Sequence, residues 1–120
     1  MAKILLAEDE ALTALAIQEL LSDYGHQVEI VATGEKVLAS VAAERPDVIL
    51  MDIGLAGPMN GIEAGHHIRA LYPIPIIFMT AYADRKHMDE VESISNAYIT
   101  KPMSIETVVQ AIDAILLHSA

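Results

Sequence analysis

The stretch Val48-Ile49-Leu50-Met51-Asp52 decides the fold, because four consecutive apolar residues end there at a carboxylate. An uninterrupted apolar run of this length is typical of a strand that is covered on both faces. Two further stretches have the same design: Ile4-Leu5-Leu6-Ala7 precedes Glu8, and Ile76-Ile77-Phe78-Met79 precedes Thr80. Strands buried on both faces occur mainly in parallel sheets with helices on each side. The sequence therefore predicts an α/β fold.

Longer amphipathic stretches separate the apolar runs, so strands and helices are expected to alternate along the chain. The expected strands are Lys3–Ala7, His26–Val31, Asp47–Met51, Pro75–Met79 and Asn96–Ile99. The expected helices are Glu10–Tyr24, Glu35–Glu44, Asn60–Leu71, Asp84–Ser93 and Ser104–His118. The helix ends carry typical residues: Gly25 follows the first helix, and Thr33 and Ser104 are expected to cap the second and the fifth.

The outer strands of the sheet can be identified from their composition. Gln27-Val28-Glu29-Ile30 alternates polar and apolar residues, and Asn96-Ala97-Tyr98-Ile99 is short and mixed, so the second and fifth strands are expected at the edges. The strand order is then 2-1-3-4-5, in a single doubly wound (βα)5 domain of the flavodoxin-like class. Right-handed crossovers place helices on both faces, and ligands bind such sheets at the carboxyl ends of the strands, where the order reverses.

Length and charge limit the classes of function. The chain has 120 residues, enough for one domain, and we expect residues 1–120 to form that domain without a further output domain. The absence of cysteine excludes disulfides and thiolate chemistry. The net charge of -10 disfavours direct contact with nucleic acid or an anionic membrane. The apolar runs are too short to cross a bilayer, so we expect a cytoplasmic protein.

Several chemically reactive side chains follow the strands and should meet at one edge of the sheet. Glu8 and Asp9 follow the first strand, Asp52 the third, Thr80 the fourth and Lys101 the fifth. Three carboxylates held together repel one another unless they take up a proton or bind a hard divalent cation through their oxygens. One divalent cation and Lys101 would together neutralise the three carboxylates. The sequence therefore predicts a Mg²⁺ site.

The combination Glu8-Asp9, Asp52, Thr80-Ala81 and Lys101-Pro102 resembles the receiver domains of two-component response regulators, and the resemblance covers the whole chain. It implies that Asp52 accepts a phosphoryl group from a phosphohistidine of a sensor histidine kinase or a phosphotransfer protein. By this resemblance the chain is a signalling domain, and its only catalysis is its own phosphotransfer and autodephosphorylation. The resemblance also implies a cis peptide bond before Pro102.

The resemblance further implies a ligand set for Mg²⁺, with Mn²⁺ as a substitute: Asp9, the Asp52 carboxylate and the Gly54 carbonyl coordinate the ion, and Glu8 acts through water or orients the ligands. Lys101, the Thr80 hydroxyl and the Ala81 backbone N–H then receive the phosphoryl oxygens. The loop after Asp52, residues 53–61, is one residue longer than the commonest family pattern.

A conformational switch is also implied by the resemblance. Thr80 moves toward the phosphoryl group, and Tyr98 enters the space that it leaves. The fourth helix has only Met88 and Val91 as evident apolar anchors between Asp84 and Ser93, so it should be displaced easily. The expected partners are a downstream protein target or output domain, and a second copy of the chain bound through the fourth helix, fifth strand and fifth helix.

Other interpretations of the same residues stay open. Glu8-Asp9-Glu10 also suits a helix N-terminus, where acidic side chains are favoured, and Tyr98 could serve packing alone. A pseudo-receiver that binds proteins without phosphorylation is the main alternative, although such a domain would normally lack part of the acidic set. A haloacid-dehalogenase-type phosphatase is disfavoured, because it would need a second aspartate where this chain has Gly54.

Overall fold

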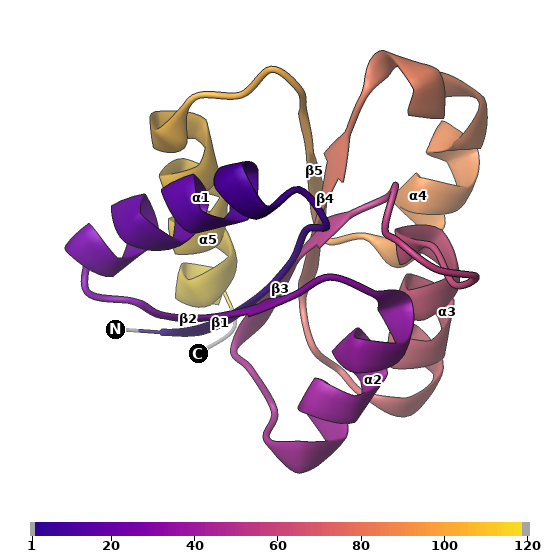
Figure 1. Cartoon of the computed structure of the whole chain (residues 1–120), viewed down its shortest axis with the longest axis horizontal. Helices are drawn as coiled ribbons and strands as arrows, with labels where there is room; N and C mark the ends of the chain where they lie inside the picture. Colours follow the sequence, from indigo (N-terminus) through magenta and orange to yellow (C-terminus); the bar gives the residue numbers. More distant parts are fainter. Residues whose placement is uncertain (1, 119–120) are drawn as a thin grey trace.

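The computed structural model describes residues 2–118 and contains one five-stranded parallel sheet in the order β2-β1-β3-β4-β5 (Figure 1). Its strands are β1 (Lys3–Ala7), β2 (Gln27–Val31), β3 (Val48–Asp52), β4 (Ile76–Thr80) and β5 (Ala97–Thr100). Its helices are α1 (Ala11–Asp23), α2 (Gly34–Ala43), α3 (Gly61–Leu71), the 3-10 helix η1 (Tyr82–His87), α4 (Met88–Ile94) and α5 (Ile105–His118). The predicted fold class and strand order are confirmed.

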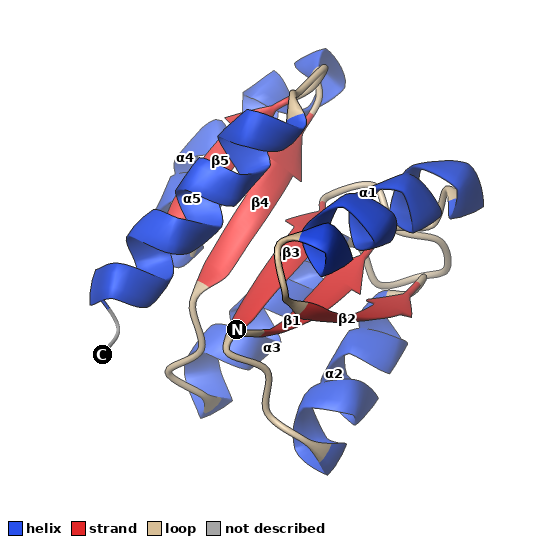
Figure 2. Cartoon of the chain, turned by 90° about the vertical axis from the view of Figure 1, so that its left-hand side faces the viewer, coloured by secondary structure: helices blue, strands red, loops and turns tan. Residues whose placement is uncertain are grey.

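Helices cover both faces of the sheet, because successive side chains of each strand point to opposite sides. Figure 2 shows α1 and α5 on one face and α2 and α3 on the other. The core beneath α1 and α5 includes Ile4, Leu6, Ala14, Ile17, Leu21, Leu50, Ile77, Met79, Val108 and Ile112. The opposite core includes Leu5, Val37, Val41, Met51, Ile62, Ile68, Phe78, Val91 and Ile94. Leu5 and Leu6, neighbours in β1, thus lie in different cores.

Burial along the strands follows the predicted division into central and edge strands. Every residue of β3 and β4 is buried, whereas β2 and β5 alternate between exposed and more buried positions. The helix caps also form as expected: Thr33 accepts a hydrogen bond from the Lys36 backbone N–H, and Ser104 accepts one from the Thr107 N–H. Gly25 ends the first helical segment with a φ of 89°, which other residues rarely adopt.

The region between β4 and β5 differs from the prediction. One helix was expected over Asp84–Ser93, but the chain forms η1 first and then the short α4. The sequence of η1, Tyr-Ala-Asp-Arg-Lys-His, offers no apolar stripe that would hold a longer α-helix against the sheet. Ile94, one residue beyond the expected end, is buried together with Val91 and adds an anchor that the prediction lacked.

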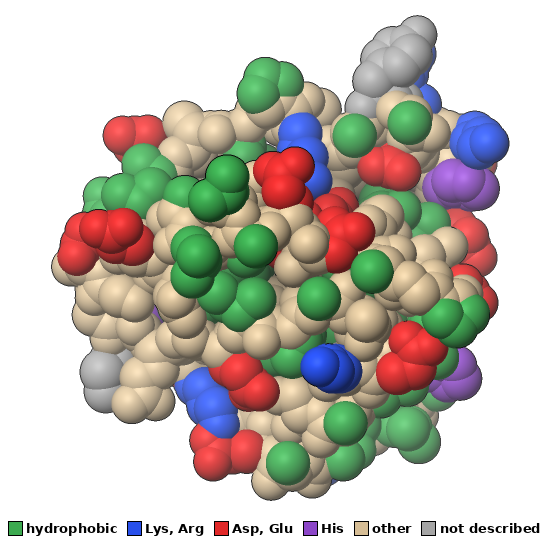
Figure 3. All heavy atoms as spheres, in the orientation of Figure 1, with side chains coloured by type: hydrophobic (Ala, Val, Ile, Leu, Met, Phe, Trp, Pro, Cys, Tyr) green, Lys and Arg blue, Asp and Glu red, His purple; other side chains and the backbone are tan. Residues whose placement is uncertain are grey.

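No helix among residues 2–118 is both long enough and apolar enough to span a membrane. Acidic, basic and apolar side chains are interspersed on the face drawn in Figure 3, which displays no broad basic patch.

Candidate functional site

The carboxyl ends of the strands bring the predicted site residues to one edge of the sheet. Asp52 and Thr80 are the last residues of β3 and β4, while Glu8 and Lys101 directly follow β1 and β5. The parallel register pairs Ala7 with Met51, Asp52 with Met79 and Thr80 with Thr100, so these strand ends lie level with one another. The Lys101–Pro102 peptide bond is cis, as the resemblance implied.

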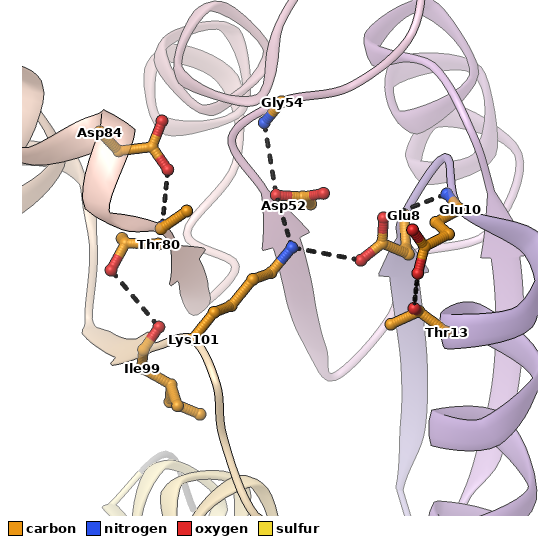
Figure 4. A network of polar contacts seen from close by, with 10 residues as sticks. Glu8, Glu10, Thr13, Asp52, Gly54, Thr80, Asp84, Ile99 and Lys101 are labelled. Atoms are coloured by element: carbon orange, nitrogen blue, oxygen red, sulfur yellow. Dashed lines mark hydrogen bonds and ion pairs between the residues drawn. The ribbon is translucent and has the colours of Figure 1, made fainter.

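Lys101 lies between two buried carboxylates (Figure 4). Its Nζ is 3.3 Å from Asp52 Oδ1 and 3.5 Å from Glu8 Oε1. Glu8 is only 3% exposed and Asp52 only 7%, whereas Asp9 is exposed. One carboxylate oxygen from each of the three acids lies within 4.8 Å of the others. The structure therefore brings together three carboxylates and one cation, which leaves negative charge in excess.

Burial and neighbouring charges perturb two of these groups. Burial is the largest effect on Glu8 and raises its pKa from 4.5 to about 7; the backbone N–H of Glu10 lowers it, Asp52 raises it and Lys101 lowers it. Burial alone would lower the pKa of Lys101, but the carboxylates of Asp52 and Glu8 outweigh it, so this pKa is raised. Lys101 is therefore a cation at neutral pH, and Glu8 ionises only at a free-energy cost.

The donor set suits a hard divalent cation. Glu8 Oε1 is buried and, beyond its ion pair with Lys101 Nζ at 3.5 Å, has no hydrogen-bond partner among residues 2–118, while Oε2 accepts a hydrogen bond from the Glu10 N–H at 3.1 Å. A buried carboxylate oxygen without a hydrogen bond is costly, and a bound cation would satisfy it. Oxygen ligands from Glu8, Asp9 and Asp52, grouped this closely, are the kind that Mg²⁺ prefers. The residues present therefore fit the predicted metal.

The two hydrogen-bond donors predicted for the phosphoryl group, Thr80 at the end of β4 and Ala81 directly after it, both have other partners. The Thr80 hydroxyl donates a hydrogen bond to the Ile99 carbonyl at 3.5 Å, on the side of β5, and Thr80 is 3% exposed. The Ala81 backbone N–H donates to Asp84 Oδ2 at 2.7 Å. From the sequence, Asp84 was expected only as the first residue of the fourth helix. Its position three residues after Ala81, the spacing of a capping box, is the signal that could have identified it.

The loop after Asp52 packs closely against the end of β2. Ile53 and Leu55 are buried, and Ala56 forms a parallel bridge with Thr33. The Gly54 backbone N–H donates to Asp52 Oδ1 at 3.3 Å, which helps to orient the carboxylate. A Cβ atom added to Gly54 would meet nothing within 4 Å, so the space beside the carboxylate is open.

An open groove of about 570 Å³ leads from the acidic cluster between α1 and the start of α5. Its lining includes the polar Glu8, Asp52 and Lys101 and the apolar Leu20, Ile105 and Val108. A reacting group on another molecule could thus approach Asp52 from solvent. Tyr98, the second predicted switch residue, is 46% exposed on β5.

Residues 4–113 match the model of the response regulator receiver domain. The chain is a receiver domain of the response regulator family. Receiver domains of this family bind Mg²⁺ in an acidic pocket and interact with kinases or phosphotransfer proteins and with output domains. In this receiver the acidic pocket corresponds to the cluster of Glu8, Asp9 and Asp52.

Curated relatives of this receiver differ in length. Protein PilH of Pseudomonas aeruginosa is 32% identical, and the match covers 97% of this chain and 98% of PilH. The transcriptional regulatory protein PdtaR of Mycobacterium tuberculosis is 29% identical over 92% of this chain but only 55% of its own length. The receiver thus spans about half the length of several of the curated relatives that it matches.

Solved structures share the fold over nearly the whole receiver. The signal receiver domain of a modulated diguanylate cyclase from Desulfovibrio desulfuricans has a TM-score of 0.90 and 27% identity, covering 98% of this chain and 95% of that one. The N-terminal domain of a response regulator/sensory box/GGDEF protein from Carboxydothermus hydrogenoformans has a TM-score of 0.88 and 30% identity, with the same coverage.

Proposed function

We propose that Asp52 accepts a phosphoryl group from a phosphohistidine on a sensor histidine kinase or a phosphotransfer protein. A carboxylate oxygen of Asp52 forms a bond to phosphorus, while the bond between phosphorus and the histidine nitrogen breaks and its electron pair stays on the nitrogen. The observation that carries this proposal is the placement of Asp52: its carboxylate lies 3.3 Å from Lys101 Nζ, at the end of an open groove.

The site residues have separate tasks in this reaction. The Gly54 N–H orients the Asp52 carboxylate, and the Lys101 cation attracts an oxygen of the incoming phosphoryl group. The Thr80 hydroxyl and the Ala81 N–H supply further hydrogen bonds once they leave their present partners.

Glu8, Asp9, Asp52 and the Gly54 carbonyl would hold the metal. A bound Mg²⁺, or Mn²⁺ in its place, supplies positive charge that offsets the charge of the phosphoryl oxygens. Glu8 Oε1 is buried and, apart from its ion pair with Lys101, has no hydrogen bond among the described residues, which favours Glu8 as part of this set.

Water later hydrolyses the acyl phosphate and returns Asp52 to the carboxylate. The chain therefore acts on no external substrate beyond its phosphoryl donor. The modification adds roughly one negative charge to the site, and this is the signal that partner proteins read. Thr80 and Tyr98 are the proposed switch residues: the Thr80 hydroxyl turns from Ile99 toward the phosphoryl group, and the exposed Tyr98 ring moves inward.

Residues 1–120 are proposed to act as a phosphoacceptor domain that passes the signal on by contact with another protein or domain. The curated relatives differ in this respect, because the match covers 98% of PilH but only 55% of PdtaR and 52% of AfsQ1. The proposed output is contact with a downstream protein target or with an output domain. A net charge of -10 argues against direct contact with nucleic acid. A homodimer through α4, β5 and α5 is the second proposed output, and size-exclusion chromatography with and without beryllofluoride tests it.

The deciding experiment is the intact mass of the protein after incubation with acetyl phosphate and Mg²⁺. We expect one added phosphoryl group, absent from Asp52→Asn and from a sample with excess chelator. If the wild-type protein stays unmodified, a phosphohistidine donor is tried next. Failure with both donors refutes the proposal and favours a pseudo-receiver that binds proteins without phosphorylation.

A further inference from the structure

Asp84 and Ala81 hold one another by two hydrogen bonds at the start of η1. The Ala81 N–H donates to Asp84 Oδ2 at 2.7 Å, and the Asp84 N–H donates to the Ala81 carbonyl at 3.0 Å. Figure 4 shows the Asp84 carboxylate beside Thr80, at the end of β4. A hydrogen bond from an N–H to a carboxylate is charge-assisted and belongs to the stronger class of hydrogen bonds.

The Ala81 N–H is a backbone donor at the edge of the sheet where Asp52 lies. Ala81 directly follows Thr80, and Asp52 pairs with Met79 in the neighbouring strand. In the proposed function, this N–H donates a hydrogen bond to a phosphoryl oxygen. A single N–H makes one strong hydrogen bond at a time, so the Asp84 carboxylate and a phosphoryl group on Asp52 compete for the same proton.

We propose that Asp84 is a positioning residue that withholds the Ala81 N–H from the phosphoryl site until Asp52 is phosphorylated. This inference rests on the proposed function and extends it to the regulation of the site. Phosphorylation draws the N–H away from Asp84, and the start of η1 loses its capping bond. The energy of that bond is thereby subtracted from the stability of the phosphorylated state.

The other end of the same segment is held more firmly. Val91 and Ile94 are buried, and the Ile94 carbonyl accepts hydrogen bonds from Arg69 Nε at 3.2 Å and Nη2 at 2.8 Å. Arg69 Nη2 also contacts Asn96 Oδ1 at 2.7 Å, and Glu90 lies 2.9 Å from His66 Nε2. Release of Asp84 therefore loosens η1 while the end of α4 stays attached to α3 and β5.

The test compares beryllofluoride binding, in the presence of Mg²⁺, by the wild-type protein, Asp84→Asn and Asp84→Ala. Asp89→Asn is the matched control, because Asp89 is exposed in the first turn of α4 and its replacement removes the same charge. We expect Asp84→Ala to bind roughly tenfold more tightly than wild type, which is the effect of losing one competing charge-assisted hydrogen bond. The beryllofluoride affinity of Asp84→Asn should lie between those of the wild-type protein and Asp84→Ala. The affinity of the control Asp89→Asn should stay within about twofold of wild type.

Amide hydrogen exchange at Ala81 provides a readout that a merely structural role would not reproduce. Without beryllofluoride, the Ala81 N–H should be protected in the wild-type protein and exposed to exchange in Asp84→Ala. With beryllofluoride it should be protected in both proteins. Circular dichroism establishes that each variant is folded. If Asp84→Ala does not fold, Asp84→Asn is compared with the wild-type protein in its place.

The outcomes separate this inference from the proposed function. If the wild-type protein neither binds beryllofluoride nor accepts a phosphoryl group on Asp52, the proposed function fails and this inference with it. If the wild-type protein does both, but the Asp84 variants bind beryllofluoride no more tightly than Asp89→Asn, only the role of Asp84 is refuted. An unprotected Ala81 amide in the free wild-type protein refutes that role as well.

Discussion

Glu8→Gln should stabilise the metal-free protein at high pH and make its stability less dependent on pH. Glu8 is 3% exposed, its Oε1 has no hydrogen bond, and its pKa is raised from 4.5 to about 7, chiefly by burial. Below pH 4.5 the carboxyl is protonated in both the folded and the unfolded chain. Between 4.5 and 7 the unfolded chain loses this proton while the folded chain retains it, so the free energy of unfolding falls as the pH rises.

The size of the effect follows from the difference between the two pKa values. At about 1.4 kcal/mol for each pKa unit, ionised Glu8 destabilises the folded metal-free protein by roughly 3 kcal/mol above pH 7. Glutamine has nearly the same shape and no charge, so the variant avoids this cost. The free energy of unfolding of a small protein falls by about 1–3 kcal/mol for each molar of urea, so the urea midpoint of Glu8→Gln at pH 8 should lie about 1 M or more above that of the wild-type protein.

The assay is urea unfolding followed by far-ultraviolet circular dichroism, in chelator, at pH 5 and pH 8. Glu19→Gln is the control, because Glu19 is exposed on α1 and its replacement removes an equal charge outside the site. Added Mg²⁺ should stabilise the wild-type protein more than Glu8→Gln. If Glu8→Gln and wild type lose the same stability between pH 5 and pH 8, the buried carboxylate of Glu8 is not the cause and the reasoning is refuted.

Three further predictions concern the site and the packing around it. Lys101→Ala leaves the Glu8 and Asp52 carboxylates without their shared cation. Phosphorylation by acetyl phosphate, followed by intact mass, should therefore slow by at least about 100-fold. An unchanged rate would show that Lys101 takes no part in the reaction. Arg69→Met leaves the Ile94 and Ile74 carbonyls without their guanidinium donor. The free energy of unfolding, measured by urea denaturation, should fall by about 2–4 kcal/mol. A loss below about 0.5 kcal/mol would show that these hydrogen bonds contribute little to stability. Gly61→Ala should lower the free energy of unfolding by about 1–3 kcal/mol, because the added Cβ would lie 2.2 Å from the Asp52 carbonyl oxygen. Gly54→Ala is the control and should leave stability nearly unchanged, because its Cβ would meet nothing within 4 Å. Equal effects of the two substitutions would contradict the packing argument.

The apolar pattern predicted most of the fold, because burial on both faces of a strand leaves a direct trace in sequence. Val48–Met51 is apolar at each position and forms the central β3, whereas the alternating Gln27–Ile30 forms an edge strand. The segment after β4 was predicted less well. A 3-10 helix held by a side chain at its start has no periodic apolar signal, so η1 was not distinguished from α4.

The meeting of Glu8, Asp52 and Lys101 could be predicted from sequence, since parallel strands place all their carboxyl ends at one edge of the sheet. The hydrogen bond from Ala81 to Asp84 could not, because it depends on the direction of one side chain in one turn.

The amino-acid sequence by itself determined the strand order and the set of reactive side chains at the sheet edge, because hydrophobic periodicity and parallel topology are sufficient to place strand ends. Only the tertiary structure decided how those side chains behave. The depth of burial of Glu8, the 3.3 Å contact of Lys101 with Asp52 and the partners of Thr80 and Ala81 arise from packing between segments far apart in the chain. Solvent exclusion and hydrogen-bond geometry set these properties, and both depend on distances in the folded protein that no local pattern encodes.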